Sequence, residues 1–203
     1  MNESNTSALL RMRDPQGYKN HDDRLLALVS LLRQLDSNLI AQFAVSYVEA
    51  YLNQSGNRHY ELSWTRLYLA RIKSVIDGEC LSEDCLSDMD PSVVDYLSTA
   101  LKNSIMSLRA MAIVRNKLDE VAKYAAEAIN WTLSTEIYTL VGEISPDLIK
   151  IHHDKSLSPT QRMKLQVGLS IQANNQPEVQ KLKWELWSQL GDKLEDILKN
   201  TNS

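Results

Sequence analysis

Two cysteines and a group of acidic residues stand close together in residues 77–90, where their side chains could serve as metal ligands. As a calcium loop, the segment would place Leu81 where an oxygen ligand is needed and Ser82 where the sharp turn requires glycine. Cys80 and Cys85 are separated by four residues, which is wider than the usual spacing of a zinc knuckle. The pattern therefore predicts no metal site, and these two cysteines are kept only as weak metal candidates.

The same segment is not expected to contain a reactive thiol, because the neighbouring carboxylates disfavour a thiolate. Two cysteines are too few for a disulfide framework, so we expect buried or half-buried thiols in an acidic surface connector. Glu83, Asp84 and Asp88 contribute to a local negative patch. This patch is a candidate for contact with a basic surface of a partner protein, and a solvated loop is the alternative interpretation.

A second group of titratable residues is the run His152-His153-Asp154, which follows a short apolar helix. Its His-Asp pair is similar to the doublet around the metal of all-helical metal-dependent phosphohydrolases. Another His-Asp pair begins at His21. However, the run leads directly into a turn, and imidazoles at a helix end are also favoured by the helix dipole. A phosphohydrolase-like helical enzyme using His152, His153 and Asp154 is therefore the alternative function.

Other catalytic signatures are missing from the sequence. There is no Gly-x-Ser-x-Gly, Walker loop or glycine-rich dinucleotide fingerprint, and the chain has only six glycines with which to build a phosphate cradle. We therefore predict no catalytic residue, no enzymatic activity and no cofactor.

The most informative surface feature is Trp184, which falls on the polar side of the last predicted helix with Lys181 and Glu195. An indole in this position predicts a contact. It either packs on another helix of the same domain or anchors an interface with a partner or a second copy, where tryptophan is common. A second indication is the methionine content, with Met106, Met111 and Met163 as side chains adaptable at partner surfaces or in a plain core.

Apolar residues recur at helical spacing through almost the whole chain, and no strand-like alternation is present. The sequence predicts an all-α, multi-helix bundle of about six to eight helices in a single domain, with a short α-solenoid as the minor alternative. Residues 1–20 contain breakers and no sustained period, so we expect a mobile N-terminal arm. Residues 21–200 are expected to form the bundle domain.

Several helix boundaries follow from turn and capping residues. Breaks are expected at residues 36–38 and 115–117, because uninterrupted rods would overshoot a compact domain of this size. Ser63 is expected to cap a helix that closes at Asp77-Gly78. Proline just inside a cap predicts helix starts at Asp90-Pro91, Ser145-Pro146 and Ser158-Pro159, and the last helix begins at Pro177.

Composition narrows the possible partners. The formal net charge of −4 lacks the positive excess that nucleic-acid binding requires, and no apolar stretch is long enough to span a bilayer. We expect a cytoplasmic protein that binds neither nucleic acid nor membranes. The leading hypothesis is a non-enzymatic protein that acts through contacts with another protein or with itself, as an adaptor, inhibitor, immunity or accessory factor. A third hypothesis is a helical bundle that binds a small apolar ligand.

Overall fold

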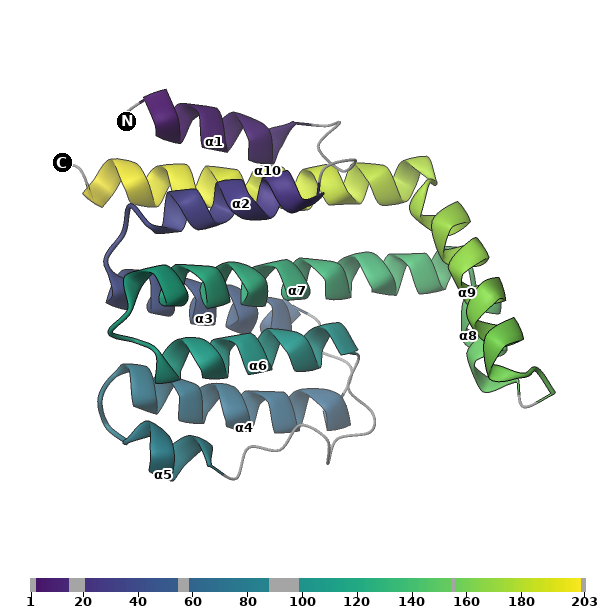
Figure 1. Cartoon of the computed structure of the whole chain (residues 1–203), viewed down its shortest axis with the longest axis horizontal. Coiled ribbons are helices and arrows are strands. Elements are labelled where there is room, and N and C mark those ends of the chain that lie inside the picture. The colour runs from purple at the N-terminus through teal and green to yellow at the C-terminus, as the bar shows by residue number, and fades with distance from the viewer. Residues whose placement is uncertain (1–2, 15–20, 55–58, 88–98, 155, 202–203) are drawn as a thin grey trace.

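The computed structural model describes residues 3–14, 21–54, 59–87, 99–154 and 156–201 (Figure 1). Within these ranges the regular structure is helical and contains no strand, which confirms the predicted all-α, multi-helix, single-domain fold. The helices are α1 (Glu3–Arg13), α2 (His21–Leu32), α3 (Ser37–Gln54), α4 (His59–Ile76), α5 (Ser82–Leu86), α6 (Thr99–Ile113), α7 (Leu118–Ile144), α8 (Asp147–His153), α9 (Pro159–Asn174) and α10 (Pro177–Thr201).

Most of the helices run side by side along the long axis of the molecule, with α1 and α10 on one side and α4 and α5 on the other (Figure 1). The two ends of the chain lie close together at one end of this bundle. At the opposite end, α8 and α9 run steeply across the direction of the other helices and extend past them. We call this pair, residues 147–174, the α8–α9 arm.

Helix α7 is the centre of the bundle, because it packs against α2, α3, α6 and α10. Small residues on α7, including Ala122, Ala125 and Ala126, are fully buried and allow neighbouring helices to approach closely. Buried hydroxyl groups between α6 and α7 are paired. The Ser104 hydroxyl of α6 lies 2.9 Å from the Thr132 hydroxyl and 3.0 Å from the Ala128 carbonyl oxygen of α7. Buried polar groups must be hydrogen-bonded in this way, so these contacts help to fix how α6 sits on α7.

The last helix supplies one wall of the core, largely as its periodicity predicts. Leu186, Leu190, Leu194 and Val179 are buried, and Leu182 is half-buried beside them. A small satellite cluster at the far end of α7 joins Val141 to residues of α9 and α10. This cluster is where the α8–α9 arm is attached to the bundle.

The predicted breaks are confirmed to within a few residues. Helix α2 ends at Leu32 and α3 begins at Ser37, where the Asp36 carboxylate accepts a hydrogen bond from the Leu39 amide at 2.9 Å. Helices α6 and α7 are separated by residues 114–117. Gly78 ends α4 with a φ of +79°, a left-handed conformation that favours glycine. Ser158 and Gln161 form a capping box at the start of α9.

Two boundaries differ from the predictions, and a third is not tested. Ser63 does not cap α4, because α4 already begins at His59. The acidic connector contains a one-turn helix, α5, where a loop was expected. The helix start predicted at Asp90-Pro91 lies outside the described residues, and the described part of α6 begins at Thr99.

The prediction of an extended or mobile N-terminal arm is wrong for residues 3–13, which form helix α1 against α2 and α10. Ala8, Leu9 and Met12 are buried in the main core. Helix α1 has too little periodic apolar surface to be recognised from the sequence alone. Packing against α2 and α10 covers the few apolar residues that it has.

Candidate functional site

Trp184 makes the contact that its sequence position indicates, and this contact is made within the same chain. The indole is 38% exposed, and its Nε1 donates a hydrogen bond to the carbonyl oxygen of Arg13 at 2.9 Å. Arg13 is the last residue of α1, so the indole pairs one of the carbonyl groups that a helix end leaves without a partner. Of the two uses predicted for Trp184, packing on another helix of the domain is the one present in the structure.

Glu195 joins the same contact. Nη2 of Arg13 lies 2.5 Å from an Asp192 oxygen and 2.6 Å from a Glu195 oxygen. The Arg13 side chain crosses α10 at Gly191, where a Cβ atom would stand only 3.2 Å from Arg13 Nε. Hydrogen bonds from Lys199 and Arg13 hold the pKa of Glu195 at about 2, well below its ordinary value. We call Arg13 and its three partners, Trp184, Asp192 and Glu195, the Arg13 contact.

Lys181, the remaining candidate on this face, lies outside the Arg13 contact. It is exposed and pairs with Glu185 one turn along α10 at 3.7 Å. An exposed pair of this kind contributes little to stability. The polar face of α10 is therefore used mainly to hold α1.

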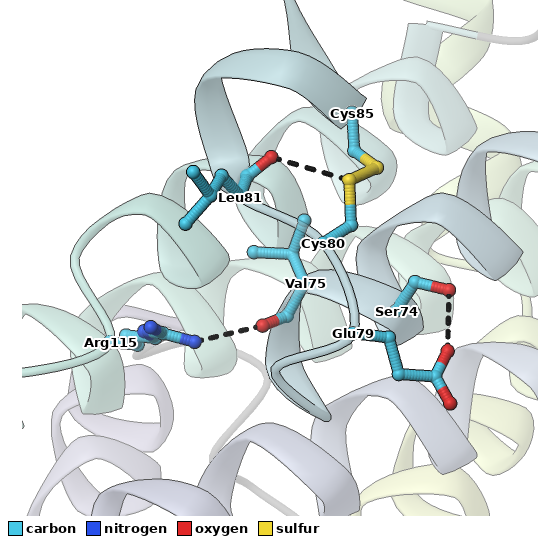
Figure 2. Close-up of a disulfide and its surroundings, with 7 residues drawn as sticks. All are labelled: Ser74, Val75, Glu79, Cys80, Leu81, Cys85 and Arg115. Carbon is cyan, nitrogen blue, oxygen red and sulfur yellow. Dashed lines mark hydrogen bonds between the residues drawn. A yellow bond between two sulfur atoms is a disulfide. The ribbon is translucent and has the colours of Figure 1, made fainter.

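The acidic connector is more ordered than a solvated loop. Leu86 of α5 is buried in the core, and the Glu79 carboxylate accepts a hydrogen bond from the Ser74 hydroxyl at 3.1 Å (Figure 2). Asp84 is exposed. The side chain of Glu83 and the whole of Asp88 lie outside the described residues, so the proposed acidic contact surface is described only at Asp84.

The prediction of two free thiols is wrong, because Cys80 and Cys85 form a disulfide (Figure 2). The single turn of α5 returns the chain so that the two Cα atoms are 6.3 Å apart, which is within the range that a disulfide bridges. Two cysteines are too few for a framework but are sufficient for one local crosslink. With both sulfur atoms in this bond, the pair does not offer thiolate ligands to zinc.

The histidine-rich run is placed at the end of α8, on the α8–α9 arm. Asp154 is exposed, and its carboxylate accepts hydrogen bonds from the Ser156 amide at 2.8 Å and the Ser156 hydroxyl at 2.6 Å. These bonds lower the pKa of Asp154. The side chains of His152, His153 and His21 lie outside the described residues. Among the described side chains, no group of three or more His, Cys, Asp or Glu residues could hold a metal ion.

Helix α9 carries a surface that the sequence analysis recognised only at Met163. Met163, Val167 and Ile171 follow one another at four-residue intervals and are 62%, 53% and 58% exposed. We call these three residues the apolar ridge. The neighbouring ridge is turned toward the rest of the molecule and is half-buried, although it consists of the polar residues Arg162, Gln166, Ser170 and Asn174. A surface helix normally shows the opposite arrangement.

Hydrogen bonds explain why the polar ridge faces inward. Arg162 donates to the Asp154 carbonyl oxygen at 2.6 Å, in the turn between α8 and α9. The Asn174 amide donates to the Ser170 carbonyl oxygen at 2.8 Å, and Gln180 of α10 donates to the Asn174 carbonyl oxygen. The polar ridge thus pairs backbone groups at both ends of α9. Ala173 is the one residue of α9 that is fully buried among those described.

An open groove of about 460 Å³ lies beside the apolar ridge. Its lining combines members of both ridges: Gln166, Val167, Ser170, Ile171, Asn174 and Asn175. The other methionines behave differently, since Met111 is fully buried in the core and Met106 is half-buried. Of the three methionines considered, Met163 is the one with a side chain available at the surface.

Comparison with known proteins finds no matching family model, no similar curated protein and no similar solved structure. Function must therefore be argued from the geometry of the surfaces and cavities. None of the described helices combines the length and apolar character needed to cross a membrane.

Proposed function

We propose that the protein is a non-enzymatic binding protein that packs the apolar ridge of α9 against an amphipathic helix of another protein. The observation that supports this proposal is the inverted arrangement of α9. Three large apolar side chains are more than half exposed on the arm while a polar ridge is half-buried. A concentrated apolar surface of this kind is typical of an interaction site.

The spacing of the apolar ridge favours a helical partner. Ridges of residues four apart pack into the grooves of a second helix, and the groove beside Val167 and Ile171 offers space for the partner's side chains. Recognition of an amphipathic helix along such a surface needs few specific polar contacts. The adaptor, inhibitor, immunity and accessory roles expected from the sequence are all compatible with this mode of binding.

Charge favours a partner with acidic residues beside its apolar stripe. Helix α9 contains no aspartate or glutamate, whereas Lys164 is exposed next to the apolar ridge. Pairing α9 with a second copy of itself would bring two such basic helices together. An acidic partner instead gains electrostatic attraction during encounter.

The proposal is tested with two labelled helical peptides that share one leucine stripe and differ only in flanking glutamates or flanking lysines. We expect the glutamate peptide to bind at least about tenfold more tightly in fluorescence anisotropy titrations, which corresponds to about 1.4 kcal/mol. The double variant Val167→Gln, Ile171→Gln should lose this binding. Leu67→Gln is the matched control, because Leu67 is 54% exposed on α4, away from the arm.

Light scattering of the purified protein provides the second measurement. A dimer that dissociates in the Val167→Gln, Ile171→Gln variant would assign the ridge to a second copy and overturn the choice of partner. Equal binding of the peptides by wild type and the double variant would remove α9 from the proposed function altogether.

A further inference from the structure

A separate feature, independent of the proposed function, is a cavity of about 370 Å³ at the end of the bundle nearer α9. Its lining residues belong to α2, α7 and α10, together with Asn174 at the end of α9. Its volume is within the usual range for small-molecule sites, which is about 300–1,000 Å³. What distinguishes it is the chemical character of its lining.

Two cationic side chains line this cavity. Arg24 of α2 is only 2% exposed, and its Nε is buried without a hydrogen-bond partner. Its Nη2 donates to the Asp14 carbonyl oxygen. Lys183 of α10 is half-buried and forms no ion pair with a described carboxylate. Among the described residues, the lining contains no aspartate or glutamate.

The electrostatics show that these cations are unfavourably placed in the unoccupied protein. Burial lowers the pKa of Lys183, and the positive charge of Arg24 lowers it further. Burial also lowers the pKa of Arg24, which the charge of Asp14 partly offsets. A bound anion would relieve both the repulsion and the unpaired Nε. Groups that oppose stability in this way are typical of binding sites.

Three aromatic rings contribute to the lining, which is completed by Asn130, Leu133, Ser134, Ile137 and Asn174. Trp131 and Tyr138 of α7 and Trp187 of α10 line the cavity, and the Arg24 guanidinium lies 5.7 Å from the centre of the Trp187 ring. Rings of this kind provide large apolar area with few rotatable bonds. A ligand that fills the cavity therefore needs a flat apolar body as well as a negative group.

We propose that this cavity binds a small aromatic carboxylate, with its two oxygens directed to Arg24 and Lys183 and its ring between the aromatic side chains. A carboxylate suits the two cations, because an arginine Nε–H and a lysine ammonium can each pair one oxygen. The Ser134 hydroxyl and the Asn174 amide, which also line the cavity, already donate to the carbonyl oxygens of Asn130 and Ser170. The part of the lining contributed by α7 and by α10 at Lys183 and Trp187 lies inside those helices, whose backbone amides are already bonded and do not supply the further donors that a phosphate group requires.

The proposal is tested by isothermal titration calorimetry of the full chain with 2-naphthoate and with 2-naphthamide, its neutral counterpart of the same shape. We expect 2-naphthoate to bind at least about tenfold more tightly. Equal affinity of the two compounds, or binding of neither, would overturn the proposal. Inorganic phosphate is the third probe. Displacement of 2-naphthoate by equimolar phosphate would show a simple anion site and would overturn the proposal that the ligand is aromatic.

Two lysine variants distinguish the effect of a cation in the cavity from the effect of the overall charge of α10. Lys183→Met should weaken 2-naphthoate binding by about tenfold or more and raise the Tm of the unoccupied protein, because a half-buried cation next to Arg24 is removed. Lys181→Met, two residues away on the exposed face, should change neither quantity. Unchanged affinity in Lys183→Met would contradict the assignment, and this variant does not depend on whether the protein tolerates loss of Arg24.

Discussion

Helices α1 and α9 are both added to the surface of the bundle, but they meet it in opposite ways. Helix α1 turns its apolar residues Ala8, Leu9 and Met12 into the core and is held at its end by the Arg13 contact. Helix α9 turns a polar ridge inward and leaves its apolar ridge exposed. The comparison shows that the apolar content of a helix does not decide whether it is covered. Helix α1 is covered because it packs against α2 and α10, whereas α9 packs mainly against α8.

The largest expected loss of stability comes from replacing a buried apolar residue of α1. Leu9→Ala should lower the free energy of unfolding by about 2–5 kcal/mol, because it leaves a cavity in a fully packed region. Urea denaturation monitored by circular dichroism measures this change. Val167→Ala on α9 is the matched substitution and should cost less than about 0.5 kcal/mol. Similar losses in the two variants would mean that α1 and α9 are packed alike.

Helix α5 is a third helix at the surface, and it differs from α1 and α9 because a disulfide attaches it to the chain that precedes it. The Cys80–Cys85 disulfide closes a very short loop, with a sequence separation of 5. For a loop of this length the restriction of the unfolded chain contributes about 2 kcal/mol. The double variant Cys80→Ser, Cys85→Ser should lose that amount in urea denaturation. A loss well above this value would indicate that α5 also organises the neighbouring ends of α4 and α6.

The attachment of α1 should depend on pH through Glu195. Because the folded-state pKa of Glu195 is about 2, below its ordinary value, its ion pairs stabilise the protein above the unfolded-state pKa. This contribution is lost as the pH falls from about 4.3 toward 2. Glu195→Gln should therefore reduce the Tm at neutral pH, with an effect of about 1 kcal/mol. The difference in Tm from wild type should shrink between these pH values, and a constant difference would contradict the assignment.

The smallest expected change in stability comes from replacing exposed residues of the apolar ridge on α9. Replacing Val167 and Ile171 with glutamine should leave the free energy of unfolding within about 0.5 kcal/mol of wild type, since neither side chain is buried. Thermal melts followed by circular dichroism provide the measurement. A large destabilisation would show that the apolar ridge is needed for folding, and would remove the contrast with α1.

The long helices can be predicted from the sequence, because their signals are local. Asp36, Gly78 and Ser158 each mark a helix boundary through their own backbone or side-chain chemistry, and the stripe of α10 follows from spacing alone. Helix α1 is not recognisable from its sequence, because its few apolar residues gain their burial from packing against α2, the next helix, and against α10 at the other end of the chain. The disulfide is not predictable from spacing, because two cysteines five positions apart meet only when α5 turns the chain between them.

The candidate site residues were predicted less completely. The spacing on α10 indicated that Trp184 makes a contact, but it could not show that the contact is the carbonyl of Arg13. Met163 was recognised as adaptable, whereas the pattern of Met163, Val167 and Ile171 would ordinarily predict a buried stripe. No sequence signal joined Arg24 to Lys183, because they meet only across the packing of α2 against α7 and α10.

By itself, the order of residues determined the all-α class, most helix boundaries and the apolar faces, since these depend on interactions between residues within a few turns of one another. Tertiary structure decided which of those faces are covered, which charges are brought together and which cysteines meet. These outcomes depend on how the chain turns and how the helices pack in three dimensions, and helix periodicity does not encode those arrangements.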